Sequence, residues 1–250
     1  MEEITVITCY NDKIKYDAFL ETLYAQDIPF AVRGIDNTAK QFPSCASALN
    51  YAIKDVKTEY VVFAHQDILL PGCSMLRDFL DAMKNSEPGS ILGVAGKVPG
   101  QPQAFSCILH GQSTETLYNP GTGFDGLVEV QTLDECFFGG ESIHFKDNPF
   151  DESLCNGWHL YAAEQCLRNI KNGRKVFACS IPLIHLSVGH PDRSFYKCFY
   201  RLCMAYSSDF DYITTGCAWG KTNIPGRWLL PFNNIGFVMF KERLRGHRNA

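Results

Sequence analysis

Short apolar runs alternate with amphipathic stretches along the first hundred residues of the chain. Four runs are rich in β-branched or aromatic residues and predict buried strands: Ile4–Cys9, Phe30–Ile35, Tyr60–Ala64 and Ile91–Ala95. Between them, apolar residues recur with helical spacing over Tyr16–Ala25, Ala46–Ile53 and Met75–Met83. Strands that are regularly separated by helices imply a mostly parallel sheet with right-handed crossovers. The pattern therefore predicts an α/β fold.

The alternation is less regular in the second half of the chain. A Gly-, Pro- and Gln-rich stretch, Gly96–Gly126, predicts loops and a hairpin. The elements expected after it are a strand over Val128–Phe138, a helix over Trp158–Asn172, a strand over Lys175–Ser180 and a helix over Ser194–Ser207. No internal repeat or linker is evident. We expect one main domain, residues 1–190, with a helical extension, residues 191–250, packed on it.

Composition and charge narrow the possible functions. The 250 residues carry a net charge of -4, so the chain lacks the basic surface of a nucleic-acid-binding protein. Met1-Glu2-Glu3 leads directly into an apolar strand, and no apolar run reaches the length of a membrane span, so we expect a cytoplasmic protein. The 11 cysteines form no CxxC pair; they are expected to be buried, reduced thiols and do not predict a zinc site.

Polar residues follow three of the predicted strands directly. They are Thr8–Asn11, Asp36–Asn37 and His65–Asp67. In open parallel sheets, ligands bind beyond the carboxyl ends of the strands. We therefore expect these three segments to line one site.

Asp67 and His185 are the candidate metal ligands. Asp67 stands where a buried strand opens, and a carboxylate there needs a partner to offset its desolvation. A divalent cation is one such partner, and a solvated turn is the alternative. His185 follows the last strand inside an apolar stretch; it is either a metal ligand or a hydrogen-bonded core residue.

Two acidic and aromatic groups could serve a second substrate. Asp151, Trp158, His159 and Glu164 lie in or before the helix predicted over Trp158–Asn172. A carboxylate or imidazole there could act as a general base, and the indole ring could support a sugar face. Asp134 and Glu135 precede an apolar strand; they either face an acceptor or form a turn.

In their order along the chain, these segments resemble the glycosyltransferases of family 2, which have the GT-A fold, and more closely the bacterial streptomycin-biosynthesis-like subgroup. The matching segments are Ile4–Asn11, Asp36–Asn37, Cys45–Asn50, Phe63–Asp67, Phe150–Glu152 and His185–Ser187. The resemblance covers residues 4–190. It implies a GT-A domain that binds a nucleotide sugar over residues 1–190.

The resemblance also implies roles for individual residues. The nucleotide pocket would be lined by Thr8, Tyr10, Asn11, Asp36, Asn37, His65 and Gln66. Asp67 would be the retained metal-binding acid of the DxD motif, with His185 as a second ligand, and Asp134, Glu135 and Trp158 would face the acceptor. The sequence departs from the family at His65, where the motif has its first acid, and near Ala162, where an acid is usual. This leaves Glu164, His159 and Asp151 as candidates for the base.

The expected function is inverting transfer of a sugar from a nucleotide-diphosphate donor, a UDP-sugar, to a glycan or lipid-linked glycan, with Mn²⁺ or Mg²⁺ as cofactor. A nucleotidyltransferase and a non-catalytic nucleotide-sugar-binding protein are the alternatives. The C-terminal segment after Trp228 mixes aromatic and basic residues, so it either contacts the inner face of the membrane or packs on the domain.

Overall fold

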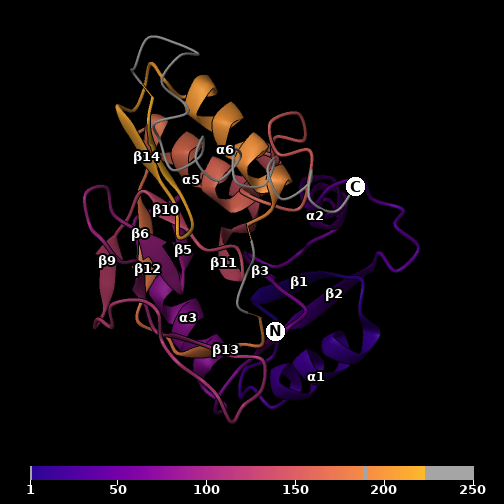
Figure 1. Ribbon diagram of the computed structural model, residues 1–250. Helices are drawn as coiled ribbons and strands as arrows, with labels where there is room; N and C mark the ends of the chain where they lie inside the picture. Colours follow the sequence, from indigo (N-terminus) through magenta and orange to yellow (C-terminus); the bar gives the residue numbers. More distant parts are fainter. Residues whose placement is uncertain (1, 188–190, 223–250) are drawn as a thin grey trace, which may run out of the picture.

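A large sheet forms the centre of the computed structural model, which describes residues 2–187 and 191–222 (Figure 1). Among these residues, the sheet has seven strands in the order β2 (Ala31–Asp36), β1 (Ile4–Tyr10), β3 (Tyr60–Ala64), β11 (Phe137–Glu141), β5 (Ile91–Gly93), β12 (Val176–Cys179) and β9 (Leu127–Glu129). Strands β1, β2, β3, β5 and β12 share one direction, while β11 and β9 run against them. The predicted α/β fold with a mostly parallel central sheet is confirmed.

Helices cover both faces of this sheet. The helices α1 (Lys13–Tyr24) and α3 (Met75–Lys84) pack on one face, and α2 (Cys45–Ile53), α4 (Ser142–Asp147), α5 (Tyr161–Lys171) and α6 (Arg193–Ala205) belong to the core on the other (Figure 1). Neighbouring residues of β3 serve opposite cores: Val62 faces the α1–α3 side, whereas Val61 and Phe63 face the α2–α5 side. Burial of both faces explains why the strands are continuous apolar runs rather than alternating ones.

The strand predicted over Val128–Phe138 is in fact three strands, β9, β10 (Thr132–Leu133) and β11. The chain turns at Asp134, whose carboxylate accepts a hydrogen bond from the Cys136 backbone N–H. This local bond ends β10 and redirects the chain into β11, which lies antiparallel between β3 and β5. Asp134 is thereby exposed and Glu135 partly buried at this turn.

The helix predicted from Trp158 begins at Tyr161 instead. Leu160 adopts a left-handed backbone conformation, with φ 66°, which an L-residue enters only under tertiary constraint and which interrupts a helix. Trp158 and His159 therefore lie in the loop before α5.

Small sheets connect the loops around the central sheet. In one of them β13 (Leu183–His185) lies between β4 (Ile68–Leu69) and β8 (Ile108–His110). In another, β6 (Ala95–Lys97) lies between β10 and β7 (Phe105–Ser106). The run predicted as one strand over Ile91–Ala95 is thus shared between two sheets.

The described part of the C-terminal extension joins the same core. Phe199 and Leu202 of α6 are fully buried in the core on the α5 side. A hairpin of β14 (Tyr212–Thr214) and β15 (Trp219–Lys221) follows α6, so residues 191–222 are not helical throughout. The segment after Trp228, for which membrane contact was predicted, lies outside the described residues. The division at residue 190 stays a prediction.

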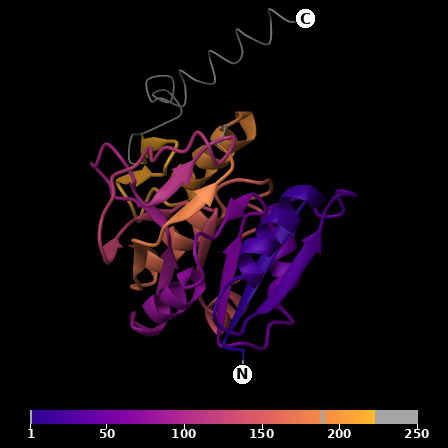
Figure 2. The same cartoon turned by 90° about the horizontal axis from the view of Figure 1, so that it is seen from below.

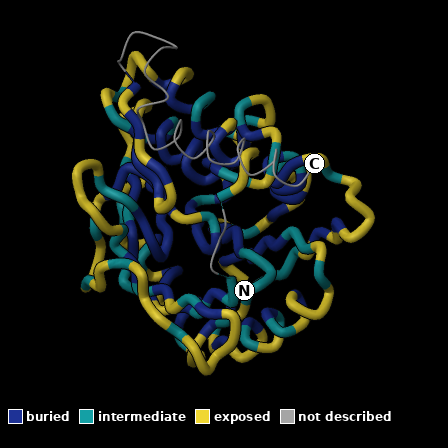
Figure 3. Tube along the Cα trace, viewed as in Figure 1, coloured by how far each residue is buried: buried dark blue, intermediate teal, exposed yellow. Residues whose placement is uncertain are grey.

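The molecule is organised around its buried centre. Figure 2 shows the N-terminal elements on one side and the later elements on the other, in line with the strand order. Figure 3 shows the buried segments running through the middle, with exposed stretches at the outer loops. Among residues 2–187 and 191–222, no helix is long and apolar enough to cross a membrane.

Most cysteines are core residues, as expected. The buried ones are Cys45, Cys136, Cys155, Cys166, Cys179, Cys198 and Cys203. Cys9 and Cys107, which were also expected inside, are partly exposed, and Cys73 and Cys217 are exposed. Burial raises the pKa of Cys166 and of Cys179 to about 12, so these two thiols stay protonated at neutral pH.

Candidate active site

A cavity of about 370 Å³ opens at the carboxyl ends of β1 and β3. Its wall includes the segments after β1, β2 and β3, the turn between β10 and β11 and the loop before α5. The end of β13, the start of α6 and the turn 215–217 also line it. This is the place where an open α/β sheet binds its ligands.

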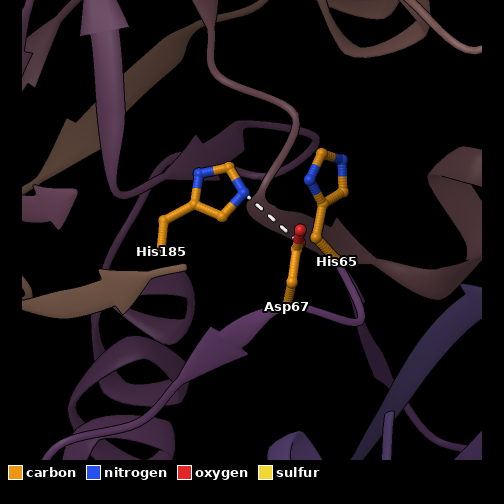
Figure 4. Close-up of side chains that lie close together, drawn as sticks. All are labelled: His65, Asp67 and His185. Atoms are coloured by element: carbon orange, nitrogen blue, oxygen red, sulfur yellow. Dashed lines mark ion pairs between the residues drawn. The ribbon is translucent and has the colours of Figure 1, made fainter. Parts of the chain in front are cut away.

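Three side chains converge at the floor of this cavity. Ligand atoms of His65, Asp67 and His185 all lie within 4.8 Å of one another. His65 and Asp67 come from the turn between β3 and β4, whereas His185 comes from β13 (Figure 4). The dashed line in Figure 4 joins His185 Nε2 to Asp67 Oδ1, at 3.3 Å.

Backbone pairing brings these distant segments together. His185 is opposite Ile68 in the antiparallel β13–β4 pair. The Leu186 N–H donates to the carbonyl oxygen of Asp67 at 2.8 Å. Because the Asp67 backbone is hydrogen-bonded to Leu186, the neighbour of His185, the sheet holds the two side chains close to each other independently of their own contact.

Asp67 is ionised in this environment. Burial opposes its ionisation, but the hydrogen bond and charge of His185, with smaller contributions from His65 and Lys15, lower its pKa to about 2. Lys15 Nζ lies 3.6 Å from Asp67 Oδ2. The floor of the cavity thus holds a carboxylate that is charged at neutral pH, although its side chain is only 15% exposed.

His65 is neutral. Burial and the nearby His185 together lower its pKa to about 4, against the opposing effect of Asp67. Its Nε2 lies 3.0 Å from the hydroxyl of Tyr161, the first residue of α5. In the tautomer whose Nε2–H donates to the Tyr161 oxygen, the lone pair of Nδ1 stays available.

The donor set fits a divalent cation. Imidazole nitrogens and a carboxylate oxygen are common ligands of transition ions in proteins, and they converge here at coordination-compatible separation. His185 Nδ1 is buried and has no hydrogen-bond partner among residues 2–187 and 191–222, and within this part of the chain the ring's polar contact is to Asp67. The predicted ligands Asp67 and His185 are thus side by side, with His65 as a third donor.

The residues predicted to bind the nucleotide are divided in space. The side chains of Tyr10, Asn11, Asn37 and Gln66 reach the cavity. Gln66 accepts from the backbone N–H groups of Asn11 and Asp12, at 2.9 Å each, and donates to the Asn11 side chain at 2.7 Å. Gln66 therefore connects the ends of β1 and β3 and fixes the shape of this wall.

Two other predicted nucleotide residues lie elsewhere. Thr8 is fully buried, and its hydroxyl has no hydrogen-bond partner in the described part of the chain. Asp36 is exposed outside this cavity, where hydrogen bonds from Thr38 lower its carboxyl pKa. It borders a second hollow of about 360 Å³ with Phe42 and Tyr51.

Residues predicted to face the acceptor meet on the opposite wall. Asp134, Glu135, Trp158 and His159 all line the cavity. His159 Nε2 lies 3.5 Å from Asp192 Oδ1, at the start of α6. Burial lowers the His159 pKa while Asp192 acts in the other direction, so the imidazole favours its neutral form.

Glu164 and Asp151, two of the three residues predicted as the base, do not line this cavity. Glu164 is 1% exposed; its carboxylate accepts from the Tyr206 hydroxyl at 2.7 Å and from Arg168 at 3.2 Å. The Asp151 carboxylate accepts from the Ser153 hydroxyl and from two backbone N–H groups of the turn. Both carboxylates therefore stabilise the fold. Glu164 points toward the end of α6, where Tyr206 lies, because α5 begins at Tyr161.

The sequence interpretation missed several residues of the cavity wall. Tyr161 falls within the helix predicted over Trp158–Asn172, and its hydroxyl contacts His65. Phe195 of α6 and the turn 215–217 line the wall opposite β1. The proximity of Tyr161 to Trp158 and His159 in the sequence could have indicated its role. No feature of the sequence indicated the turn 215–217, because only tertiary packing brings it to the cavity.

Comparison with known proteins gives the family. The model described as "Glycosyltransferase like family" matches residues 5–188, which is most of the chain. A protein of Fuscovulum blasticum described as "ATP synthase subunits region ORF 6" is 24% identical over 232 residues, covering 90% of this chain and 91% of that protein.

Solved structures with the same fold include glycosyltransferases. S. aureus TarS 1-349, in complex with UDP-GlcNAc, superposes with a TM-score of 0.54 and 17% identity, over 81% of this chain and 66% of that chain. The mannosyltransferase PcManGT from Pyrobaculum calidifontis, in complex with GDP-Man and Mn²⁺, gives 0.50 and 12%, over 81% and 61%. The chain thus spans about two thirds or less of these two structures.

The family match and the fold agree with the position of the cavity at the strand ends. The chain therefore belongs to the glycosyltransferase-like family of the family 2 type and is a glycosyltransferase with the GT-A fold.

Proposed function

We propose that this protein transfers a sugar, with inversion, from a nucleotide-diphosphate donor of the UDP-sugar type to a hydroxyl group of a glycan or lipid-linked glycan. A divalent cation, Mn²⁺ or Mg²⁺, is its cofactor. The observation that carries the proposal is the cluster of Asp67, His65 and His185 on the floor of a cavity at the carboxyl ends of the sheet. TarS and PcManGT, which share the fold, were solved with UDP-GlcNAc and with GDP-Man and Mn²⁺.

The cavity has one wall for each substrate. The donor's nucleoside lies against the side formed by Tyr10, Asn11 and Asn37, where the Tyr10 ring is already stacked on Tyr16 at 4.1 Å. The acceptor enters along Trp158, whose side chain is 43% exposed and offers an apolar face to a sugar ring. The diphosphate then lies between the walls, above Asp67.

A cation at this point offsets the charge that develops on the departing diphosphate. In the chain itself, Asp67 and His185 would hold it, and Lys15, 3.6 Å from Asp67, adds a positive side chain at the same edge. The reaction forms one bond and breaks one. The acceptor oxygen bonds to the anomeric carbon from the face opposite the diphosphate as the bond from that carbon to the phosphate oxygen breaks.

His159 is the proposed base. Of the three predicted candidates it alone lines the cavity, and its neutral form can take the proton that the acceptor hydroxyl loses. Asp192, 3.5 Å from its Nε2, orients the ring, so the other ring nitrogen is the one that accepts the proton. Asp134, on the same wall, is placed to accept a hydrogen bond from the acceptor.

Product analysis tests the proposal. The protein is incubated with a panel of UDP- and GDP-sugars, with Mn²⁺, Mg²⁺ or EDTA, and the released nucleotide is identified by chromatography. Metal-dependent release of a nucleoside diphosphate, by slow hydrolysis or by transfer to an added glycan, is the expected result. Release of pyrophosphate would instead indicate a nucleotidyltransferase, and tight nucleotide-sugar binding without turnover would indicate a non-catalytic protein.

The place of action is part of the proposal. We expect a bacterial enzyme of polysaccharide biosynthesis that works in the cytoplasm, either free or peripheral at the inner face of the membrane. Flotation with vesicles that contain anionic lipid, for the full chain and for a chain ended before Trp219, tests whether the C-terminal segment contributes to contact with the membrane.

A further inference from the structure

Two cysteine thiols meet where the loop before α5 packs on α6. Cys155 belongs to that loop and Cys198 to α6, and their sulfur atoms lie 3.9 Å apart. Cys155 is fully buried and Cys198 is 4% exposed. Both are free thiols, although they are 43 positions apart in the sequence. The fold thus places two oxidisable sulfur atoms in contact, between two elements that contribute to the cavity wall.

The surroundings of the pair make Cys198 the more acidic thiol. A hydrogen bond from Cys155 and the nearby Arg201 guanidinium lower the pKa of Cys198, against the effect of burial, while the same contact raises the pKa of Cys155. Arg201 is held beside the loop, because its Nε donates to the Leu154 carbonyl at 3.1 Å and its Nη2 to the Asn156 side chain at 2.7 Å. Since the thiolate is the nucleophilic form, Cys198 is expected to react first and Cys155 second.

The loop can open far enough to admit a small oxidant. From Asp151 to Leu160 it contains no helix or strand, and Cys155 and Leu160 are its only buried residues. Segments with few buried contacts open locally at a low cost in free energy. Carbonyl groups of this loop cover the Cys198 sulfur, so its opening exposes both thiols. Hydrogen peroxide, which is close to water in size, can then reach them.

We propose that Cys155 and Cys198 form a redox-sensitive pair, which hydrogen peroxide converts into a disulfide that links the loop before α5 to α6. The Cys198 sulfur attacks one peroxide oxygen and the O–O bond breaks; the leaving hydroxide takes the thiol proton, which gives a sulfenic acid and one water. The Cys155 sulfur then attacks the Cys198 sulfur and loses its proton, the S–O bond breaks, and a second water leaves. Two thiols and one peroxide thus give one disulfide and two waters.

Formation of the bond moves the loop. The sulfur atoms of a disulfide are about 2.0 Å apart, so the two atoms must approach each other by about 1.9 Å. The helix α6 is anchored in the core by Phe199 and Leu202, so the loop is the part that shifts. The bond also removes both S–H donors, and the carbonyls of Leu160 and His159 lose contacts of 3.4 and 3.6 Å. The backbone at the cavity wall is therefore rearranged.

Oxidation should act on the acceptor side of the cavity, and this part of the inference rests on the proposed function. The loop carries Trp158 and His159, and Asp192 at the start of α6 lies 3.5 Å from His159 Nε2. A displacement of about 1 Å at a catalytic group can slow a reaction by about 100-fold. The donor wall, with Tyr10 and Asn37, is formed by the segments after β1 and β2, which the disulfide does not join.

Disulfide mapping on the full chain tests the chemistry independently of activity. The reduced protein is treated with hydrogen peroxide, the remaining thiols are alkylated, and the digested peptides are identified by mass spectrometry. We expect a Cys155–Cys198 cross-link that dithiothreitol reverses. Cys155→Ser should instead retain a sulfenic acid at Cys198, which dimedone traps, and Cys198→Ser should form no cross-link. Cys73→Ser, at an exposed position, is the matched control and should form the cross-link as wild type does.

Activity and donor binding measure the effect of the bond. Transfer by the oxidised protein, with the nucleotide sugar found by product analysis, should be slower by about tenfold or more, and dithiothreitol should restore it. UDP affinity, measured by calorimetry, should not change on oxidation. Cys198→Ser, which cannot form the bond, should keep its own rate of transfer after the same treatment. Circular dichroism checks that each variant is folded.

The outcomes separate the pair from the function on which its effect rests. If peroxide modifies Cys73 but no Cys155–Cys198 cross-link forms, the redox pair is wrong and the proposed function still stands. A cross-link that leaves transfer unchanged would overturn the effect on the acceptor wall. If the reduced protein releases no nucleoside diphosphate from any nucleotide sugar, the proposed function is wrong and the effect on transfer falls with it, while the mapping still decides on the pair.

Discussion

His185 Nε2 lies 3.3 Å from Asp67 Oδ1, although Asp67 is in the turn after β3 and His185 is on β13, far apart in the sequence. The contact joins a charged carboxylate to an imidazole at the floor of the cavity, and the flanking backbone bond between Leu186 and Asp67 holds it in place. Since the backbone sets the geometry, the carboxylate can be changed without loss of the fold.

Asp67→Asn should therefore abolish metal-dependent binding of UDP and leave the fold intact. The amide is nearly isosteric but carries no charge, so affinity for Mn²⁺ should fall by about 100-fold or more, beyond the effect of most residues that only orient ligands. Calorimetry with UDP, with and without Mn²⁺, measures it. Asp81→Asn, an exposed position on α3, is the matched control and should bind as wild type does; the same result in both variants would contradict the role of Asp67.

His159→Gln should reduce the rate of transfer with little effect on donor binding. A general base contributes about 10²- to 10⁴-fold to a rate, so kcat should fall within that range. Steady-state kinetics with the donor found by product analysis, and UDP binding measured in parallel, separate the two quantities. A loss of UDP affinity equal to the loss in kcat would assign His159 to the donor side instead.

Tyr206→Phe should lower stability without slowing transfer. It removes the hydroxyl that donates to the buried Glu164 at 2.7 Å and leaves a buried acceptor short of a partner. Such a loss costs about 1–3 kcal/mol. Urea unfolding followed by circular dichroism measures the stability, and kcat of the folded variant should equal that of wild type. A large fall in kcat would return Glu164 to the list of candidate bases.

Much of this architecture was accessible from the sequence. The apolar runs gave the strands of the parallel core, and the rule on carboxyl strand ends grouped His65–Asp67 with Tyr10–Asn11. The direction of each strand could not be predicted from the sequence, because an apolar run such as Cys136-Phe137-Phe138 looks the same in a parallel and in an antiparallel strand. The antiparallel placement of β11 depends on the turn at Asp134.

The candidate base was harder to predict for a related reason. Which side of α5 faces the cavity depends on the residue at which the helix begins. The left-handed conformation of Leu160 moves that start to Tyr161, and the local sequence does not predict this conformation. Glu164 then meets Tyr206, a residue of a much later segment. Such contacts between residues far apart in the sequence arise from tertiary packing, so the periodicity of apolar residues does not predict them.

Gly139→Ala should destabilise the protein strongly. Gly139 lies in the middle of β11, and a Cβ there would overlap the backbone carbonyl oxygen of Val61 on β3, which cannot move aside as a side chain can. Overpacking of this kind costs about 3 kcal/mol or more. Thermal and urea unfolding measure the loss. Gly123→Ala, where the added carbon meets nothing within 4 Å, should change stability by less than about 0.5 kcal/mol.

His144 should make stability depend on pH in mildly acidic solution. Burial, with the charges of Arg174 and Arg168, lowers its pKa from 6.5 to about 4, and its Nδ1 accepts from Arg174 at 2.8 Å. The folded state keeps His144 neutral while the unfolded chain takes up a proton, so the stabilisation is complete above pH 6.5 and is lost as the pH falls toward 4. The shift corresponds to about 3 kcal/mol.

Urea unfolding at several pH values between about 7 and 4 measures this dependence. His144→Gln cannot titrate, so its stability should fall less steeply over the same interval, whatever its stability at neutral pH. Parallel slopes for the two proteins would show that His144 does not contribute.

The pairing of β13 with β4 also bears on how the molecule is made. Asp67 and His65 leave the ribosome early, but His185 is synthesised only after every strand of the central sheet, because β12 ends at Cys179. A nascent chain can therefore assemble most of its scaffold before it has a complete set of donors. On the proposed function, the cation can bind only after β13 has been synthesised, so truncated products that end before β13 should not bind the metal.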